Sequence, residues 1–492
     1  MKTINSEWEL MTRAGMLLAL AFLPSGVLAQ SPRDVVARAV QAMGGEAAVR
    51  GLRNKTVDFY SSNFQLGQEE TPLSPPRATV SYGRIVTDYA GTRQLTTQEA
   101  RVLTGAVNRQ RRIVAGGIGI TELNGATTVD APGAVNAAVR GMALQPERIL
   151  LSALDNPAGL SALVAKSFRG ETMTGVRYAV APDTMNLWFD RPTGMLVVSE
   201  QVTDDPVLGD RRTLTWYTRW QDATGVQLPR QVDTEVNGRI LSHNVVGSLS
   251  INQSLDESQF GIPDSLASRA QRGPAPAPVM TVTLAELAPR VWRAEGGTHH
   301  SLIIDQGATL LVVEGPLGSA RTNAVLDTLK SRFPDKRVSA VVATHHHWDH
   351  SGGLRAYMAR GIPVVAHPRN LAFVHAVGSA RKTVARDAIS RGKAAPAPRS
   401  SGDSLSIGTG ESRVVLLTIA SDHVEGILAA WVPSAGIVFT SDILSPQPNQ
   451  ALPAAGSREL VAFAKGRGIN PSKYVGGHGV IVDWSAVEAA SR

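Results

Sequence analysis

The sequence contains no cysteine in its 492 residues. This absence excludes disulfide bonds, thiolate metal ligands and a cysteine nucleophile together. It leaves the redox compartment open, because a chain without cysteine is compatible with either one. Any metal ion bound by this chain must therefore be held by histidine, aspartate or glutamate.

Dense basic blocks and long apolar runs are scarce as well. The formal net charge is +7, yet the Lys and Arg residues are scattered and form no block of the kind that binds nucleic acid. After the leader described next, no segment resembles a membrane span, which needs ~20 consecutive apolar residues. We therefore expect no nucleic-acid partner.

The N-terminal segment has the layout of a secretory signal peptide. Thr12-Arg13 is followed by the apolar run Met16–Leu23 and by the small-residue site Val27–Ala29. This order predicts a leader at residues 1–29, cleaved after Ala29, and an exported, most simply periplasmic, protein. Translation from Met1 or from Met11 stays open, and an uncleaved leader that anchors the chain to the membrane is the alternative.

The length predicts two domains, since one hydrophobic core usually serves ~100–200 residues. Residues 30–263 read as a β-rich domain, in which Asn237-Gly238 suits a hairpin turn with two positive φ angles. A helix is expected to begin at Ser31-Pro32, end at Gly44-Gly45 and lie against this sheet. Residues 264–280 are rich in Pro and Ala and predict an extended linker, so residues 281–492 form the second domain.

The first domain resembles the antiparallel β half-barrel of periplasmic lipoprotein carriers. The resemblance rests on turn and aromatic positions, namely Leu187-Trp188-Phe189-Asp190, Thr193-Gly194, Trp220, Gly225-Val226, Leu228-Pro229 and Ser254-Leu255-Asp256 before Phe260. It implies a helix packed on a curved sheet and a groove for an apolar or lipid ligand. That these aromatic residues are only core residues is an equally open alternative.

The second domain carries a dense group of metal-ligand residues. Its predicted elements come in the order strand 301–304, strand 309–313, helix 322–333 and strand 338–343. The last strand runs directly into His345, His347, Asp349 and His350. His345 and His347 are two apart in an extended segment, so both imidazoles can face one cation, while Asp349 and His350 can face a second.

This His-x-His-x-Asp-His motif after a strand is similar to that of the metallo-β-lactamase superfamily, and the likeness covers about residues 281 to 485. It implies an α/β fold, a four-layer αββα sandwich, with two metal ions at one edge of its sheets. The first metal would be held by His345, His347 and His423, the second by Asp349, His350 and His478, with Asp442 between them. Three positions depart from the common pattern, namely Glu314 in place of Asp, Ser441 before Asp442 in place of Gly, and Asp422 before His423 in place of Gly.

The implied activity is that of a metal-dependent hydrolase with two Zn²⁺ ions, Fe or Mn being alternatives. A hydroxide shared by the two metals would attack an ester, lactone, thioester or related substrate in the exported compartment, with Asp349 as the catalytic residue that orients it. Asp442 disfavours β-lactams, because β-lactamases usually lack that carboxylate. An iron-dependent oxidoreductase and a non-catalytic binder of apolar ligands stay open as alternatives. His300 and His346 could support a metal ligand or face the substrate, or they could have ordinary hydrogen-bonded roles.

Overall fold

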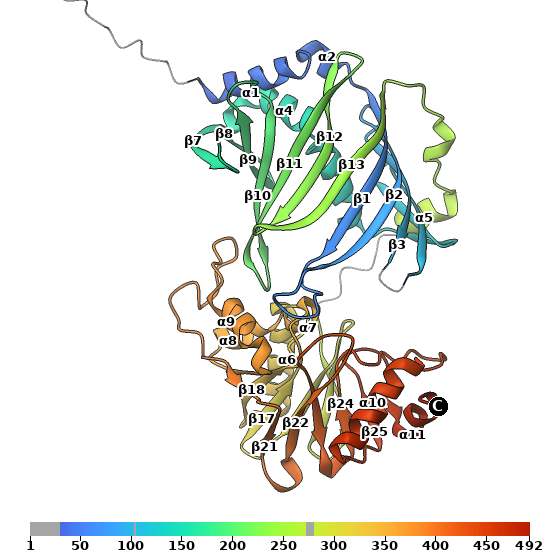
Figure 1. Cartoon of the computed structure of the whole chain (residues 1–492), viewed down its shortest axis with the longest axis vertical. Helices are drawn as coiled ribbons and strands as arrows, with labels where there is room; N and C mark the ends of the chain where they lie inside the picture. The colour runs from blue at the N-terminus through green and yellow to red at the C-terminus, as the bar shows by residue number, and fades with distance from the viewer. Residues whose placement is uncertain (1–29, 103–104, 272–279) are drawn as a thin grey trace, which may run out of the picture.

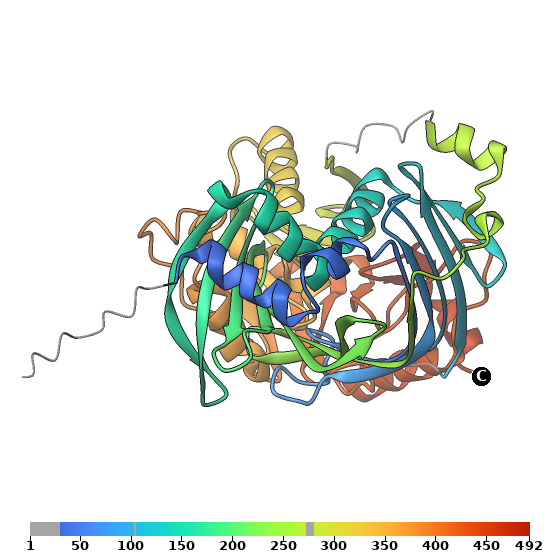
Figure 2. The same cartoon turned by 90° about the horizontal axis from the view of Figure 1, so that it is seen from above.

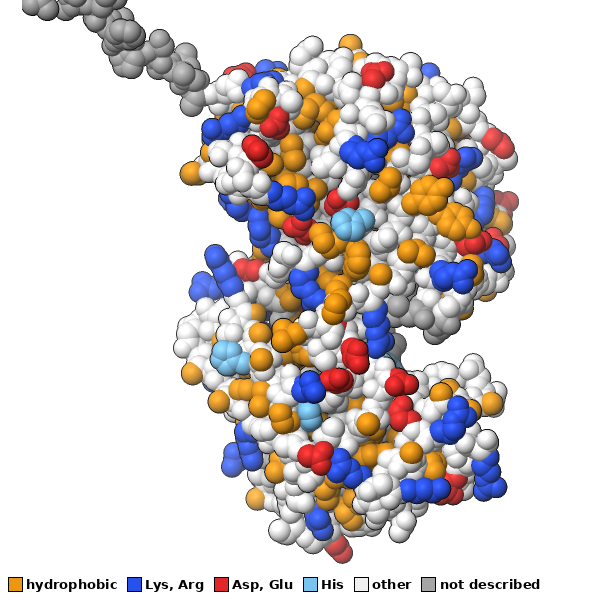
Figure 3. Space-filling model, in the orientation of Figure 1, with side chains coloured by type: hydrophobic (Ala, Val, Ile, Leu, Met, Phe, Trp, Pro, Cys, Tyr) orange, Lys and Arg blue, Asp and Glu red, His pale blue; other side chains and the backbone are white. Residues whose placement is uncertain are grey.

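The computed structural model describes residues 30–102, 105–271 and 280–492 and shows two domains, one above the other in Figure 1. The predicted leader at 1–29 lies outside the described residues. Within the described ranges, no helix is both long and apolar enough to span a membrane. On the face shown in Figure 3, Lys and Arg side chains are interspersed with acidic and uncharged ones.

The N-terminal domain is built on one antiparallel sheet of 13 strands, in the order β6-β5-β4-β3-β2-β1-β13-β12-β11-β10-β9-β8-β7. Its strands are β1 (Asn54–Gln65), β2 (Arg77–Asp88), β3 (Arg93–Arg101), β4 (Val107–Ala115), β5 (Ile118–Leu123), β6 (Ala126–Val129), β7 (Leu160–Phe168), β8 (Glu171–Val180), β9 (Asp183–Asp190), β10 (Leu196–Asp205), β11 (Gly209–Ala223), β12 (Val226–Val236) and β13 (Arg239–Ile251). Its helices are α1 (Pro32–Ala42), α2 (Glu46–Arg50), α3 (Pro132–Ala143), α4 (Pro146–Asp155) and α5 (Asp264–Gln271).

The sheet curves around a group of helices, as Figure 2 shows from above. Helix α1 begins with a capping box, in which the Ser31 hydroxyl accepts from the Asp34 N–H while Asp34 accepts from the Ser31 N–H. Its apolar face packs with α4 against the strands in a core that includes Val36, Leu150 and Leu187. The predicted half-barrel with a helix against it is confirmed as a fold.

Two local predictions in this domain have different outcomes. The turn between β12 and β13 is the expected one, because Asn237 and Gly238 have φ angles of 48° and 84°. Residues 264–271 of the predicted linker form α5 instead of an extended chain, and Leu266 packs beside Phe260. The prolines begin only at Pro274, and the Ala, Leu and Arg residues before them favour a helix. Residues 272–279 lie outside the described residues.

The C-terminal domain contains a seven-stranded sheet, β14-β15-β16-β17-β18-β19-β20, and a six-stranded sheet, β21-β22-β23-β24-β25-β26. The strands of the first sheet are β14 (Thr283–Ala288), β15 (Val291–Glu295), β16 (Ser301–Asp305), β17 (Thr309–Val313), β18 (Arg337–Ala343), β19 (Val364–Ala366) and β20 (Arg399–Ser400). The strands of the second are β21 (Ser404–Ile407), β22 (Val414–Ile419), β23 (Ile427–Val432), β24 (Ile437–Phe439), β25 (Lys473–Val475) and β26 (Val482–Asp483). The helices are α6 (Ser319–Arg332), α7 (Trp348–Ser351), α8 (Leu354–Ala359), α9 (Leu371–Ser379), α10 (Ala454–Arg467) and α11 (Trp484–Ala490).

Three hydrophobic cores in this domain define four layers. Alternate residues of a strand face opposite sides of a sheet, so in β16 Ile303 faces α6, α8 and α9, whereas Leu302 faces the second sheet. The core between the two sheets includes Leu416 of β22, and a third core joins the second sheet to α10 and α11. The predicted αββα sandwich is confirmed.

Leu416 offers a test of this layer arrangement, because its side chain is fully buried between the two sheets. We expect Leu416→Ala to lower the free energy of unfolding of the C-terminal domain by about 2–5 kcal/mol, measured by urea denaturation. The matched control is Leu73→Ala, since Leu73 is 96% exposed and its truncation should change stability by less than about 0.5 kcal/mol. Equal effects of the two substitutions would contradict the placement of the inter-sheet core.

Candidate metal centre

The ligand-type side chains follow strands that end at one edge of the sandwich. Strands β17 and β18 are parallel neighbours, as are β24 and β25, and β22 runs in the same direction as β24 because β23 is antiparallel to both. Carboxyl ends of parallel strands meet at the same edge of a sheet, which is where open α/β sheets bind ligands. The segments that follow these strands carry Glu314, His345–His350, His423, Asp442 and His478.

Three imidazoles and a carboxylate form the first cluster. One ligand atom each from His345, His347, His423 and Asp442 lies within 4.8 Å of the others. His345 Nε2, His347 Nδ1 and His423 Nε2 are buried and make no hydrogen bond. Burial and the neighbouring histidines lower the pKa of His345 well below its ordinary value, and burial lowers the pKa of His347 to about 3. The rings of His345 and His347 are therefore neutral, the form in which imidazole binds metal.

The tautomers of the cluster agree with metal binding. His347 Nε2 donates to the backbone carbonyl of Glu69 over 3.0 Å, so the buried Nδ1 carries only a lone pair. His345 Nδ1 lies 3.1 Å from the Thr344 hydroxyl, which leaves Nε2 for the cluster. Buried acceptors without partners cost about 1–3 kcal/mol each, and a cation at their meeting point removes that cost.

Asp349, His350 and His478 form the second cluster, together with His299. His350 Nε2 and His478 Nε2 face each other at 3.3 Å, and His350 Nε2 lies 3.4 Å from Asp349 Oδ2. His478 Nδ1 donates to the Thr298 carbonyl over 2.9 Å, so its Nε2 is directed at the cluster. Burial opposes a charge on His350, but the surrounding carboxylates raise its pKa well above the ordinary value. The carboxylates thus favour a positive charge in this cluster, which a bound metal ion would supply.

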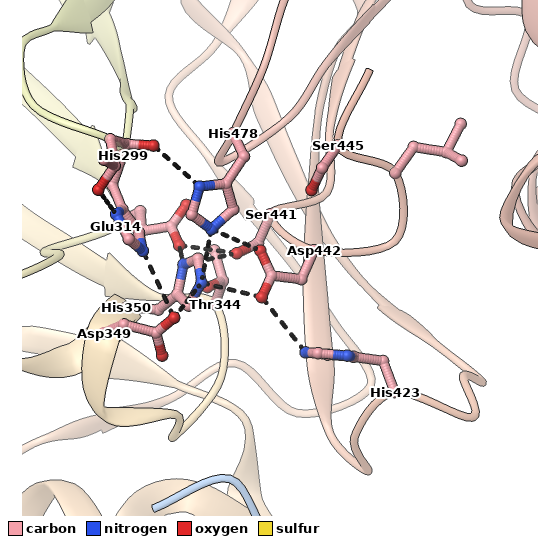
Figure 4. A network of polar contacts seen from close by, with 12 residues as sticks. His299, Glu314, Thr344, Asp349, His350, His423, Ser441, Asp442, Ser445 and His478 are labelled. Carbon is pink, nitrogen blue, oxygen red and sulfur yellow. Dashed lines mark hydrogen bonds and ion pairs between the residues drawn. The ribbon is translucent and has the colours of Figure 1, made fainter. Parts of the chain in front are cut away.

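Asp442 lies between the two clusters, as Figure 4 shows. Its Oδ2 is 2.9 Å from His350 Nε2 and 3.4 Å from His423 Nε2, and its Oδ1 is 3.3 Å from His478 Nε2. Burial opposes ionisation, but the histidines around it lower the pKa of Asp442 well below its usual range. An ionised carboxylate in this position can ligate a metal in either cluster.

Glu314 supports the second cluster from behind. Its carboxylate accepts from His350 Nδ1 and from the Ser441 hydroxyl, the latter over 2.7 Å. Glu314 and Ser441 both have positive φ, 80° and 50°, a backbone conformation that side-chain-bearing residues adopt at a cost. The two departures from the superfamily pattern at these positions therefore contact each other and keep His350 Nε2 directed at the cluster.

The structure brings together the seven residues predicted as ligands and places a further candidate, His299, beside them. His299 lies just before β16, with its Nε2 3.5 Å from Asp349 Oδ2 and its ring centroid 4.0 Å from that of His478. The sequence signal was the pair His299-His300 at the start of a strand, because adjacent residues there point in opposite directions.

His300 and His346 do not join either cluster. His300 Nε2 donates to the Gly479 carbonyl over 3.2 Å, and burial lowers its pKa to about 4. The His346 ring packs edge-on against Phe373, with centroids 5.9 Å apart, and burial lowers its pKa to about 4 as well. The His300 ring is thus hydrogen-bonded away from the clusters, whereas neither ring nitrogen of His346 makes a hydrogen bond.

The donor set fits two divalent cations, since the two clusters supply imidazole and carboxylate ligands in numbers that suit catalytic zinc and related metals. The first cluster would hold one ion through His345, His347 and His423, and the second another through Asp349, His350 and His478. Asp442 would serve both.

Several solved structures and one family profile are similar to part of this chain. Similar solved structures include TMB-1 (15% identity over 43% of this chain and 95% of that chain, TM-score 0.33), a metallo-β-lactamase from Pontibacter korlensis (16%, 42% and 96%, TM-score 0.33) and the mono-zinc form of the metallo-β-lactamase FIM-1 from Pseudomonas aeruginosa (18%, 43% and 93%, TM-score 0.34). No curated protein matches the chain in sequence. The sequence profile of the metallo-β-lactamase superfamily matches residues 295–485, a range that contains every ligand described above.

Glu314→Gln tests the support of His350. The amide cannot accept from His350 Nδ1 as strongly as a carboxylate, so we expect divalent metal at the second cluster to bind about 10–100-fold more weakly. Competition with a chelator of known affinity measures this change. Glu488→Gln is the control, since Glu488 is exposed at the C-terminal helix α11. An unchanged affinity in Glu314→Gln would show that this carboxylate does not position the ligand.

Proposed function

We propose that the protein is a binuclear zinc hydrolase and that residues 295–485, which match the profile of the metallo-β-lactamase superfamily, form its catalytic domain. The proposed substrates are esters, lactones, thioesters or related small molecules. The observation that carries the proposal is the place of Asp442, whose two oxygens are directed at ligands of both clusters. A carboxylate in that position supports two metal ions working on one substrate.

In this proposal some residues hold the metal ions and one orients the attacking water. His345, His347 and His423 hold one side of the site, and His350 and His478 hold the other. Bound zinc supplies a Lewis acid and brings the pKa of a coordinated water towards neutrality. Asp349 is the catalytic residue of the proposal, because its carboxylate belongs to the second cluster and is partly exposed, so that it can orient an attacking water.

β-Lactams are less suitable substrates in this proposal. The superfamily includes enzymes that act on many acyl, phosphoryl and sulfuryl bonds, so the fold by itself does not choose among them. The bridging place of Asp442 supports a hydrolase of the thioesterase or lactonase kind. The predicted leader supports an exported, periplasmic enzyme, which favours substrates outside the cytosol.

A second candidate is an iron-dependent oxidoreductase on the same ligands. The specific observation that favours it is His299, which gives the second cluster one imidazole more than a catalytic zinc ion needs. A larger mixed set of imidazole and carboxylate donors suits iron or manganese. Metal identity distinguishes the two candidates.

An apolar or lipid ligand in the N-terminal domain also stays a proposal. It is supported by a cavity of about 360 Å³ between α3, α4 and the strands β8 and β9, lined by Met142, Leu144, Ile149 and Val180. Saturable binding of a fluorescent fatty acid by the full chain, lost on Ile149→Arg, would support it. The absence of saturable binding would contradict it.

Metal analysis of the full chain together with substrate turnover tests the proposed hydrolase. We expect about two zinc ions per chain and turnover of at least one substrate in a panel of chromogenic ester, lactone, thioester, β-lactam, sulfate and phosphodiester compounds. Asp349→Ala should lower kcat/KM by more than about 100-fold, because even partners one shell further out are worth about 10–100-fold.

Asp327→Ala is the matched control, since Asp327 is exposed on α6 and away from the ligands, and it should leave kcat/KM unchanged. Iron in place of zinc would replace the hydrolase by the oxidoreductase. No bound metal and no turnover would leave the binding role of the N-terminal domain.

A further inference from the structure

The loop between β1 and β2 of the N-terminal domain reaches the metal centre of the other domain. Figure 1 shows this blue loop beside α7, at the junction of the domains. The Gly67 carbonyl accepts from the Trp348 N–H over 3.2 Å, and the Glu70 carbonyl accepts from the Glu425 N–H over 2.9 Å. The loop therefore spans from the His-x-His-x-Asp-His segment to the segment that carries His423.

Two residues of this loop hydrogen-bond to metal-ligand side chains, one in each cluster. Gln68 Nε2 donates to Asp349 Oδ1 over 2.8 Å, which leaves Oδ2 directed towards His350. The Glu69 carbonyl accepts from His347 Nε2 over 3.0 Å, which leaves Nδ1 directed at the first cluster. Such partners fix the orientation and tautomer of a ligand.

The loop is held rigidly enough to perform this role. Gly67 has a φ of 80°, and a Cβ at this position would lie 2.2 Å from the Trp348 ring, so the backbone fits tightly against that side chain. Glu69 is only 1% exposed, and its carboxylate pairs with Arg239 of β13. Backbone fit and ion pair together fix the positions of the Gln68 amide and the Glu69 carbonyl.

A second contact holds the domains in register. The Thr383 hydroxyl donates to Asp210 Oδ2 over 2.8 Å, and the Asp210 N–H donates to the Arg381 carbonyl over 2.7 Å. These bonds join the start of β11 to the loop that follows α9. With two separate contacts, the N-terminal sheet is docked against the metal domain and not joined to it by the chain alone.

We propose that residues 67–70 of the N-terminal domain are a positioning element of the metal centre, in which Gln68 orients Asp349 and the Glu69 carbonyl orients His347. The proposal rests on the metal centre of the proposed function. It gives the N-terminal domain a part in metal binding that does not depend on any apolar ligand in that domain.

Gln68→Met tests the side-chain contact, because methionine keeps the length of the side chain and removes its donor. We expect Zn²⁺ at the second cluster to bind about 10–100-fold more weakly in the full chain, measured by chelator competition. We also expect the visible absorption spectrum of the Co²⁺-substituted protein to change, since that spectrum reports ligand geometry. The control is Gln98→Met, which removes an amide hydrogen bond to Gln110 within the N-terminal sheet.

Gly67→Ala tests the loop as a whole. The new Cβ must displace either the loop or Trp348, so we expect weaker Zn²⁺ binding at both clusters. Gly125→Ala is the matched control, because Gly125 has a φ of 87° in the turn between β5 and β6 and its Cβ would meet nothing within 4 Å. Both glycines have a positive φ, so both substitutions strain the backbone, but only Gly67→Ala should affect metal binding.

The outcomes separate this proposal from the proposed function. A wild-type chain that binds no Zn²⁺ would remove the metal centre itself. A wild-type chain that binds two ions, with the same affinities and Co²⁺ spectrum in Gln68→Met and Gly67→Ala, would overturn the positioning role alone. Urea unfolding midpoints close to wild type in Gln68→Met ensure that a loss of metal reflects positioning and not loss of the fold.

Discussion

Several buried imidazole nitrogens meet at one edge of this fold with their lone pairs directed at the same points, and the rest of the structure has to keep them there. Each buried polar atom without a partner lowers stability by about 1–3 kcal/mol, so an unsupported cluster would rearrange. The rearrangement is resisted by two sheets that enclose a buried hydrophobic core between them. The packed sandwich therefore keeps the imidazole groups in positions that would be unfavourable without a bound partner.

The backbone conformation at the ends of the strands also helps to position the candidate ligands. Glu314 and Ser441 adopt positive φ angles directly beside the ligands, and their side chains bond to each other. Strain of this kind persists only where the surroundings over-determine it. Here the carboxylate bond to His350 and the buried strands on either side impose that conformation.

Local sequence patterns predicted most helices and strands and the ligands of the His-x-His-x-Asp-His motif, because both depend on residues that are close together in the sequence. The spacing of His345, His347, Asp349 and His350 is itself the signal, and likeness to a superfamily supplied His423, Asp442 and His478. The place of His299 in the second cluster depends on the tertiary fold, which brings the residues before β16 to the edge of the sandwich that carries the other candidate ligands. Glu69 acts through a backbone carbonyl, which every residue has, and Gln68 lies 281 positions from Asp349. No pattern in the sequence marks such contacts.

The hydrogen bond from His347 to the Glu69 carbonyl joins two processes that are usually considered separately. A contact between domains that strengthens metal binding must, by thermodynamic reciprocity, be strengthened by the metal to the same extent. Metal loading and domain docking then share one coupling free energy. On this view a metal-free chain would sample a wider range of interdomain angles than a metal-loaded chain.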